Sequence, residues 1–414
     1  MLKVALLSVL LATAQTFASE STGTAAKAIN SLGIELLAKI SKPDQNALLS
    51  PYSIQSALAM TYVGADGVTR AEMARVLHYP TNDTELHGSF AAMQRALDEV
   101  IQKSKTSSEE TRQYGATNDP ITLTVANRLF GQSGYDFGAA FLDFKTSYAA
   151  PFEPLDFVRD SRSATKHIND WVENQTRQRI RNLIPDDALD KFTRLVLVNA
   201  IYLKAPWEEP FKDRNSQPSA FHLGNGESVN VPTMMQQHAF GYEARDGYRI
   251  VTIPYANGEI QFLILLPDAT QGLEALEKKL TKELFAYCAR VRNRELLLFL
   301  PKFKLEPPTI SVGDELKAMG MRSAFDEPPG SANFDRITPR RPNDHLYISG
   351  IFHKTFLKLD EQGTEAAAAS AVDETTGILE RAKLEVHVDH PFLFAIQHRP
   401  SGACLFLGRI VDPR

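Results

Sequence analysis

A continuous apolar run from Leu195 to Leu203 is the feature that most constrains the fold of this chain. A strand with one solvated face alternates apolar and polar residues, whereas this run is interrupted only by Asn199. The pattern is typical of a strand that is buried on both faces. We therefore expect this strand in the middle of the protein, with other elements covering it on each side.

The chain before this run is mostly helical in pattern, and the chain after it is mostly extended. Apolar residues recur at helical spacing over residues 26–40, from 51 onwards, and over 70–77, 86–101 and 161–180. Extended apolar patterns occupy residues 121–130, 248–255, 260–266, 296–303, 346–359, 392–396 and 405–411. We find no internal repeat and no linker between two parts, so the sequence predicts one α+β domain.

Three local patterns predict where elements begin or end. Ser50 and Pro51 predict a helix start, because a proline at an early helical position loses no hydrogen bond. Thr69 followed by Glu72 predicts a capping box for the helix over residues 70–77. Residues 103–120 are polar and nearly devoid of large apolar side chains, which predicts a mobile surface loop.

The N-terminus has the pattern of a secretory signal. Lys3 precedes an apolar run from Val4 to Ala12, and small residues end at Ala18. We therefore expect a signal peptide over residues 1–18, a domain over residues 19–414, and a secreted or extracellular protein, periplasmic if the organism is bacterial. A buried N-terminal helix is the alternative. The run is shorter than the roughly 20 apolar residues that span a bilayer, so we expect no membrane partner.

The two cysteines, Cys288 and Cys404, are too few for a disulfide scaffold. Cys288 lies in a helical pattern and Cys404 in a strand pattern, and nothing in the sequence brings them together. We expect two free thiols, because cysteine often acts as a small buried apolar residue. Asn82 and Asn174 match the glycosylation pattern, which matters only in a host that glycosylates exported proteins.

Charge and motifs exclude several classes of function. The formal net charge is −5, from 45 basic and 50 acidic residues, which argues against a nucleic-acid partner. The sequence has no nucleophile elbow, zinc-protease motif, phosphate-binding loop or dinucleotide fingerprint. We therefore expect no catalytic residue, no cofactor and no metal. An enzyme without a recognisable signature is the alternative.

The most informative segment follows the extended pattern that ends at Leu359. It contains Gly363, then four alanines at 366–369, and then a polar stretch. An alanine-rich helix is one interpretation, since alanine is the best helix former. The other is a segment that changes state, because Gly363 is a permissive pivot and small side chains can enter a packed sheet without clashes.

Several ordered motifs resemble those of the serpins, and the resemblance runs from about Ala26 to Pro413. The motifs are residues 46–79, 199–204 with Trp207, 300–303, 346–349 with His353 and Lys354, 361–370, 390–394 and 406–410. The resemblance implies an α+β serpin fold, in which about nine helices pack on three β-sheets. It also implies an exposed reactive-centre loop over about residues 363–386.

The resemblance further implies a suicide inhibitor of serine-type endopeptidases. The target cleaves the loop, and the freed part inserts into the main sheet and traps the acyl-enzyme. The expected partner is a serine protease, or a cysteine protease, bound through the loop by a monomeric inhibitor. A non-inhibitory serpin that acts as a carrier or chaperone is the alternative.

Three groups of residues carry over from the family by position. The hinge matches Glu361, Gly363, Thr364, Glu365, Ala366, Ala367, Ala368, Ala369 and Ser370. A shutter cluster beneath the opening strands matches Ser50, Ser53, Asn199 and His353, and a breach cluster at the top of the sheet matches Trp207, Lys302 and Glu361. Lys302 and Glu361 are expected to form a salt bridge.

The resemblance places the reactive-site bond 16 positions after Glu361, between Gly377 and Ile378. Glycine is a poor anchor for most specificity pockets. Leu379, Glu380 and Arg381 therefore stay open as alternatives, since Leu379 would suit a hydrophobic pocket and Arg381 an acidic one.

Overall fold

The structure is a computed structural model that describes residues 22–112, 119–134, 138, 152–341, 344–365 and 384–414. One helix covers residues 22–40. The other described α-helices are α2 (Pro51–Gly64), α3 (Gly67–Val76), α4 (Asp83–Arg112), α6 (Phe157–Gln175), α7 (Leu273–Glu277), α8 (Lys282–Cys288) and α9 (Val312–Ala318). Within the described residues no helix is long and apolar enough to cross a membrane.

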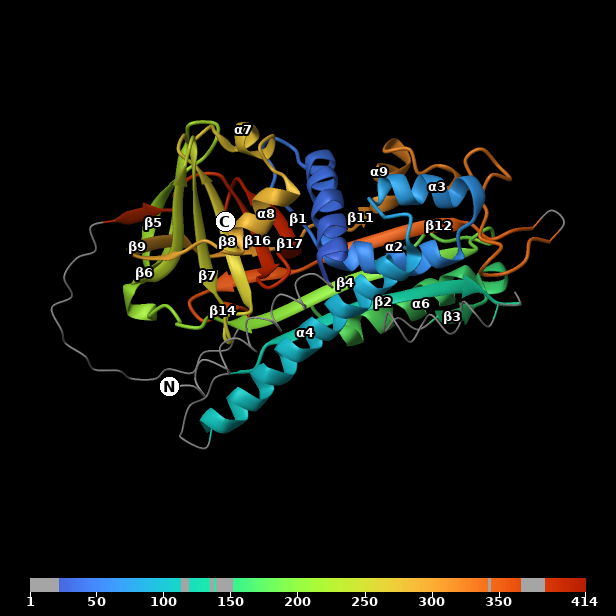
Figure 1. Cartoon of the computed structure of the whole chain (residues 1–414), viewed down its shortest axis with the longest axis horizontal. Coiled ribbons are helices and arrows are strands. Elements are labelled where there is room, and N and C mark those ends of the chain that lie inside the picture. The colour runs from blue at the N-terminus through green and yellow to red at the C-terminus, as the bar shows by residue number, and fades with distance from the viewer. Residues whose placement is uncertain (1–21, 113–118, 135–137, 139–151, 342–343, 366–383) are drawn as a thin grey trace, which may run out of the picture.

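The main sheet is built around β4 (Leu195–Pro206). Along one path its order is β10 (Phe303–Leu305), β13 (Leu357–Asp360), β14 (Gly363–Thr364), β4, β12 (Ile348–Thr355) and β11 (Ile310–Ser311). Both β14 and β12 pair with one edge of β4. The opposite edge of β4 pairs with β2 (Thr122–Gln132), and β2 pairs in turn with β3 (Phe152–Leu155). Figure 1 shows α6 lying along β2 and β3.

The second sheet follows the order β1 (Ala47–Leu49), β17 (Ala403–Ile410), β16 (Phe392–His398), β8 (Ile260–Pro267), β7 (Tyr248–Pro254), β6 (Ser228–Arg245), β9 (Asn293–Pro301) and β15 (Glu385–His387), with β5 (Gln217–His222) paired to β6. Where three sheets were expected, hydrogen bonds join the described strands into two. The long strand β6 joins two of the expected sheets into one, because it pairs with β5 near its start and with β7 near its end.

The prediction that the 195–203 strand is buried on both faces is confirmed. Val196, Val198 and Ala200 pack with α6 in one apolar cluster. Leu197 and Ile201, on the opposite face, belong to the larger cluster that contains the second sheet. Because alternate residues of a strand point to opposite faces, both clusters need apolar side chains from the same short segment.

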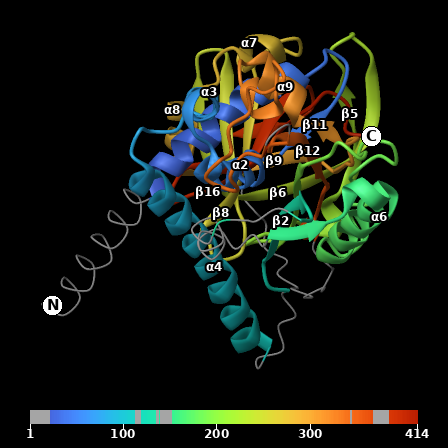
Figure 2. The same cartoon turned by 90° about the vertical axis from the view of Figure 1, so that its right-hand side faces the viewer.

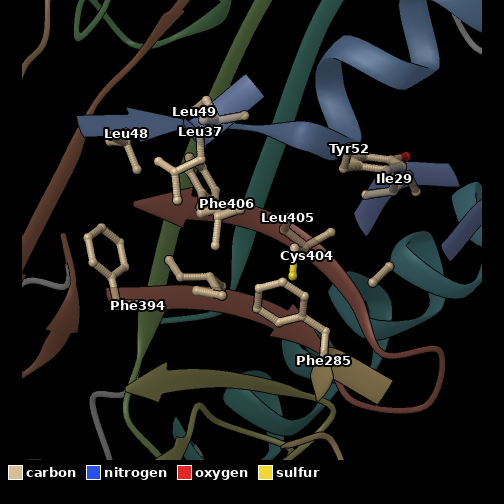
Figure 3. Packing of buried hydrophobic residues seen from close by; sticks show 14 of the residues in the cluster. Ile29, Leu37, Leu48, Leu49, Tyr52, Phe285, Phe394, Cys404, Leu405 and Phe406 are labelled. Atoms are coloured by element: carbon tan, nitrogen blue, oxygen red, sulfur yellow. The ribbon is translucent and has the colours of Figure 1, made fainter. Parts of the chain in front are cut away.

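The larger apolar cluster lies where the second sheet meets the helices. Figure 3 shows Phe394 of β16 and Phe406 of β17 packed with Leu48 and Leu49 of β1. Cys288 and Cys404 are buried free thiols, as expected. Burial raises the pKa of the Cys288 thiol to about 12, so this sulfur behaves as a small apolar group.

Two local predictions are wrong. Thr69 does not cap α3, because the helix begins after Asp66 and the Thr69 hydroxyl instead accepts a hydrogen bond from the Asn333 amide at 3.0 Å. Glu72 binds the backbone amides of Arg322 and Ser323 rather than the start of its own helix. The loop expected over residues 103–120 is helical up to Arg112, where α4 extends away from the body (Figures 1 and 2).

The predictions for the N-terminus, for the two glycosylation sites and for the helix start at Ser50 have different outcomes. Residues 1–18, expected to be a signal peptide, lie outside the described residues. Asn82 and Asn174 of the glycosylation pattern are both exposed. The helix start predicted at Ser50 and Pro51 is confirmed, since α2 begins at Pro51 and the Ser50 side chain accepts a hydrogen bond from the Ser53 amide.

Candidate functional site

The first hinge residues already lie inside the main sheet. Gly363 and Thr364 form β14, which pairs antiparallel with β13 on one side and with β4 on the other. Below β14, β4 and β12 pair directly and in parallel, from Leu195 opposite Ile348 to Ile201 opposite Thr355. We call this boundary between β4 and the β12–β13 edge the seam. The seam is thus filled at its upper end and closed below.

Gly363 cannot be replaced by a residue with a side chain at this position. Its φ is +139°, a conformation that L-residues rarely adopt. A Cβ added there would meet the Ala205 carbonyl oxygen at 2.1 Å and the Pro206 Cα at 2.8 Å. The entry of β14 between its neighbours therefore depends on glycine.

Thr364 is fully buried and anchored by a side-chain hydrogen bond. Its hydroxyl lies 2.5 Å from the hydroxyl of Tyr255. The Tyr255 ring stacks on Trp207 with a centroid distance of 4.5 Å and an interplanar angle of 9°. Burial raises the pKa of Tyr255, so the phenol stays protonated and can donate to Thr364.

The breach residues named from the sequence lie together beside β14. Lys302 and Glu361 approach at 2.9 Å, and Glu361 also accepts a hydrogen bond of 2.6 Å from the Ser216 hydroxyl. Burial opposes ionisation of Glu361, but the bonds from Ser216 and Lys302 outweigh it and hold the pKa of the carboxyl below its usual range. The Trp207 indole N–H donates to the Asp360 carbonyl at 3.0 Å.

The shutter residues also lie together, in the middle of the seam. Asn199 of β4 and His353 of β12 are register partners across it. Nε2 of His353 accepts a hydrogen bond of 3.0 Å from the Ser50 amide, and the Ser53 hydroxyl lies 3.4 Å from Oδ1 of Asn199. The start of α2 is therefore tied to both strands that would have to separate.

His353 is held neutral in this cluster. Burial lowers its pKa to about 3, and a contact with the Asn199 backbone opposes this only in part. Since Nε2 accepts from Ser50, the neutral ring carries its proton on Nδ1. Among the described residues the Asn199 Nδ2 group has no hydrogen-bond partner. The cluster is thus incompletely satisfied while the seam is closed.

Sequence reasoning missed three residues that complete the two clusters. Asn127 of β2 accepts a 2.9 Å hydrogen bond from the Ser53 hydroxyl and donates a 3.1 Å bond to the Ser53 carbonyl. Tyr255 and Ser216 supply the contacts to Thr364 and Glu361 described above. The sequence indicates Asn127 only weakly, as a polar residue inside the extended pattern over residues 121–130.

The remainder of the loop is not part of the described structure. Ala366, Ala367, Ala368, Ala369 and Ser370 of the hinge lie outside the described residues. So do Gly377 and Ile378 of the expected reactive-site bond and the alternatives Leu379, Glu380 and Arg381. The described chain resumes at residue 384 and enters β15.

Comparison with known proteins finds similar chains of nearly the same length. A family profile described as "Serpin (serine protease inhibitor)" matches residues 27–413. Serpin B10 of Rattus norvegicus is 35% identical over 400 residues, which cover 94% of this chain and 99% of the relative. Leukocyte elastase inhibitor of Bos taurus is 37% identical over 385 residues, 90% and 94% of the two chains. The solved structure of tengpin, a thermophilic serpin in the native state, has a TM-score of 0.80 at 27% identity and covers 94% of each chain.

Proposed function

The chain belongs to the serpin family, and from this premise we propose that it is a secreted suicide inhibitor of a serine-type endopeptidase. The family is that of the serine protease inhibitors, and the chain is a protease inhibitor rather than an enzyme. The observation that carries the proposed mechanism is β14. Its two hinge residues, Gly363 and Thr364, already pair with β13 and β4, and insertion of the loop would extend this short strand.

The proposed reaction begins as ordinary proteolysis of the loop. The target's serine oxygen attacks the carbonyl carbon of Gly377, the Gly377–Ile378 bond breaks, and the new amino group of Ile378 leaves with a proton. The acyl-enzyme then carries residues up to Gly377. The freed segment from Gly363 to Gly377 would span about 46 Å when extended, enough to continue β14 down the seam.

Strand pairing gives a physical reason for insertion to be favourable. β4 and β12 are parallel neighbours, and β14 is antiparallel to both β4 and β13. Insertion would replace one parallel pairing with two antiparallel ones, and parallel pairing is slightly less stable per residue. At the same time, the backbone N–H and C=O groups of the loop would exchange hydrogen bonds to water for hydrogen bonds to the neighbouring strands.

Side-chain size supports entry into the seam. The Thr364 hydroxyl contacts Tyr255 of the larger apolar cluster, so alternation directs Ala366, Ala368 and Ser370 to the same face of an inserted strand. These side chains are small, and none is charged. A wider or charged group at these positions would have to displace packed core atoms or be buried without a partner.

Incubation with chymotrypsin-like, elastase-like and trypsin-like proteases tests the function. An inhibitor yields a covalent complex that survives SDS, and its loop-cleaved form melts at a higher temperature than the intact form. Thr364→Arg places a charge at a fully buried hinge position and should convert the protein to a substrate that is cut without complex formation. A wild type that is cut without complex formation would support the carrier or chaperone alternative instead.

The reactive-site bond and the signal peptide are tested by separate measurements. N-terminal sequencing of the fragment released by cleavage distinguishes the Gly377–Ile378 bond from cleavage after Leu379, Glu380 or Arg381. Intact-mass measurement on the exported protein tests removal of residues 1–18. A product that retains these residues would contradict the proposed signal peptide.

A further inference from the structure

Residues 176–182, which follow α6, cross the seam on its α6 side, and we call them the strap. The Arg177 guanidinium lies over the ring of Tyr202 on β4, 5.8 Å from its centroid. The Arg179 guanidinium lies over the ring of Phe356, which follows β12, at 5.7 Å, and Lys354 donates to the Arg181 carbonyl at 2.9 Å. The strap therefore contacts both strands that border the seam.

Three residues of the strap adopt left-handed backbone conformations. Arg177, Gln178 and Asn182 have φ values of 50°, 62° and 48°, in the left-handed region that costs non-glycine residues free energy. Residues on either side hold it down, because Val172 and Leu183 are fully buried in the apolar cluster beneath α6. The left-handed conformations persist because these contacts determine the path of the chain.

Glu365 connects this strap to the loop. It directly follows β14, and its φ of 50° turns the chain out of the extended conformation. Its side chain is only 8% exposed and forms an ion pair with Arg179. Apart from this contact, neither carboxylate oxygen accepts a hydrogen bond from a described residue.

The charges around Glu365 single out Arg179 as its partner. Lys204 and Lys358 also face the carboxylate, but Lys204 pairs with Asp119 at 2.7 Å and Lys358 with Asp360 at 2.9 Å. Tyr202 lies nearby as a neutral phenol. Burial raises the pKa of Glu365, and Arg179 is the largest opposing influence. A carboxylate this buried would be costly without its cation.

We propose that Arg179 is a positioning residue for loop insertion, because its ion pair with Glu365 holds the loop at two inserted residues and ties the strap across the seam. This inference rests on the proposed function. Further insertion requires Glu365 to become extended, which moves its carboxylate relative to the strap. It also requires the strap to release one of the two strands that it contacts.

Uptake of a synthetic peptide with the sequence of residues 366–376, which begins just beyond β14, tests the proposal without a protease. A native gel and the rise in melting temperature report the rate at which the peptide fills the seam. Arg179→Ala should raise this rate about 5- to 30-fold, the range for an interaction of one to two kcal/mol. Arg181→Ala is the matched control, because that side chain pairs with Glu173 at 3.2 Å and not with the loop.

A double-mutant cycle excludes a general loosening of the strap. In a Glu365→Ala background, Arg179→Ala should have no further effect on the rate, since the two residues act through one contact. Equal rates for Arg179→Ala, Arg181→Ala and wild type would overturn the proposal, as would an undiminished Arg179→Ala effect in the Glu365→Ala background. If Arg179→Ala does not yield folded monomer, Glu365→Gln makes the same test, and a wild-type rate would overturn the proposal.

The proposed protease inhibition and the proposed role of Arg179 can be contradicted independently of each other. A wild type that takes up peptide but forms no covalent complex with any protease contradicts the proposed inhibition and leaves the Arg179 effect measurable. A wild type that forms complexes while Arg179→Ala and Arg181→Ala take up peptide equally keeps the inhibition and removes the role of Arg179.

Discussion

The hydroxyl groups of Tyr255 and Thr364 lie 2.5 Å apart in the protein interior, although 109 positions separate them in the sequence. Tyr255 also stacks on Trp207, and Trp207 binds the Asp360 carbonyl. One short chain of contacts thus joins the end of β7 to both ends of the β13–β14 turn. The upper end of the seam is held by specific polar bonds as well as by packing.

Tyr255→Phe removes this hydrogen bond and leaves the buried Thr364 hydroxyl without its partner. We expect a loss of about 1–3 kcal/mol in the free energy of unfolding. We also expect faster amide hydrogen exchange in a peptide that contains β14. The control is Tyr52→Phe, which removes a 2.8 Å bond from another buried tyrosine to Gln94 and makes no change at Thr364. Equal exchange of β14 in both variants would show that the Tyr255 bond does not anchor the hinge.

Glu361→Lys replaces the Lys302 ion pair with a repulsion and removes the acceptor for Ser216. We expect the upper end of the seam to loosen, so that the loop of one molecule can enter the sheet of another on warming. Size-exclusion chromatography after mild heating should show polymers. Adding Lys302→Glu restores opposite charges and should restore monomers. A single variant that stays monomeric would argue against a role for this pair in closing the seam.

Asn127→Ala removes two hydrogen bonds to Ser53 from the shutter cluster. We expect a loss of about 1–3 kcal/mol in the free energy of unfolding, together with faster peptide uptake into the seam. Asn46→Ala is a suitable control, because Asn46 binds the backbone of Val411 and Asp412, near the C-terminus. Both variants should lose stability, but only Asn127→Ala should accelerate uptake. Acceleration by both would indicate a global effect.

His353 should make stability depend on pH. Its pKa falls from 6.5 to about 3 in the folded protein, so between these values the unfolded state binds a proton that the native state does not. Stability is therefore complete above about pH 6.5 and falls with decreasing pH by about 1.4 kcal/mol per unit, or about 2 kcal/mol at pH 5.

His353→Gln keeps an acceptor for the Ser50 amide but does not titrate. Urea unfolding at pH 7.5 and pH 5 should show a smaller loss of stability for this variant than for wild type. His398, whose pKa burial lowers to about 4, contributes equally to both proteins and cancels in the comparison. Identical losses in the two proteins would contradict the assignment of the pH dependence to His353.

Some elements followed from local sequence because their cause is local. The helix start at Ser50 and Pro51 needs only a side-chain acceptor and a fixed φ, and both are present in two adjacent residues. Thr69 and Glu72 carry an equally good local pattern, but Thr69 binds Asn333 and Glu72 binds Ser323. Distant donors competed for the same oxygens, and a local pattern contains no information about them.

The segment over residues 103–112 illustrates the same limit. Its polar composition indicated a loop, yet Ser104 and Ser108 are buried on one side of α4. The Ser104 hydroxyl accepts the Ile121 amide at 2.8 Å. Strand β6 was also not anticipated, since its mixed composition gains meaning only in its long pairing with β9. Tertiary contacts supplied the free energy that local composition did not indicate.

By itself, the order of residues determined that the 195–203 strand must be covered on both faces and that a glycine followed by small side chains lies next to the sheet. These properties depend on side-chain size and polarity, which each residue carries with it. Only the folded chain decided that Asn127 completes the cluster around Ser53 and that Arg179 lies beside Glu365. Such pairs join residues from different elements, so their existence depends on how the whole chain packs and not on any one segment.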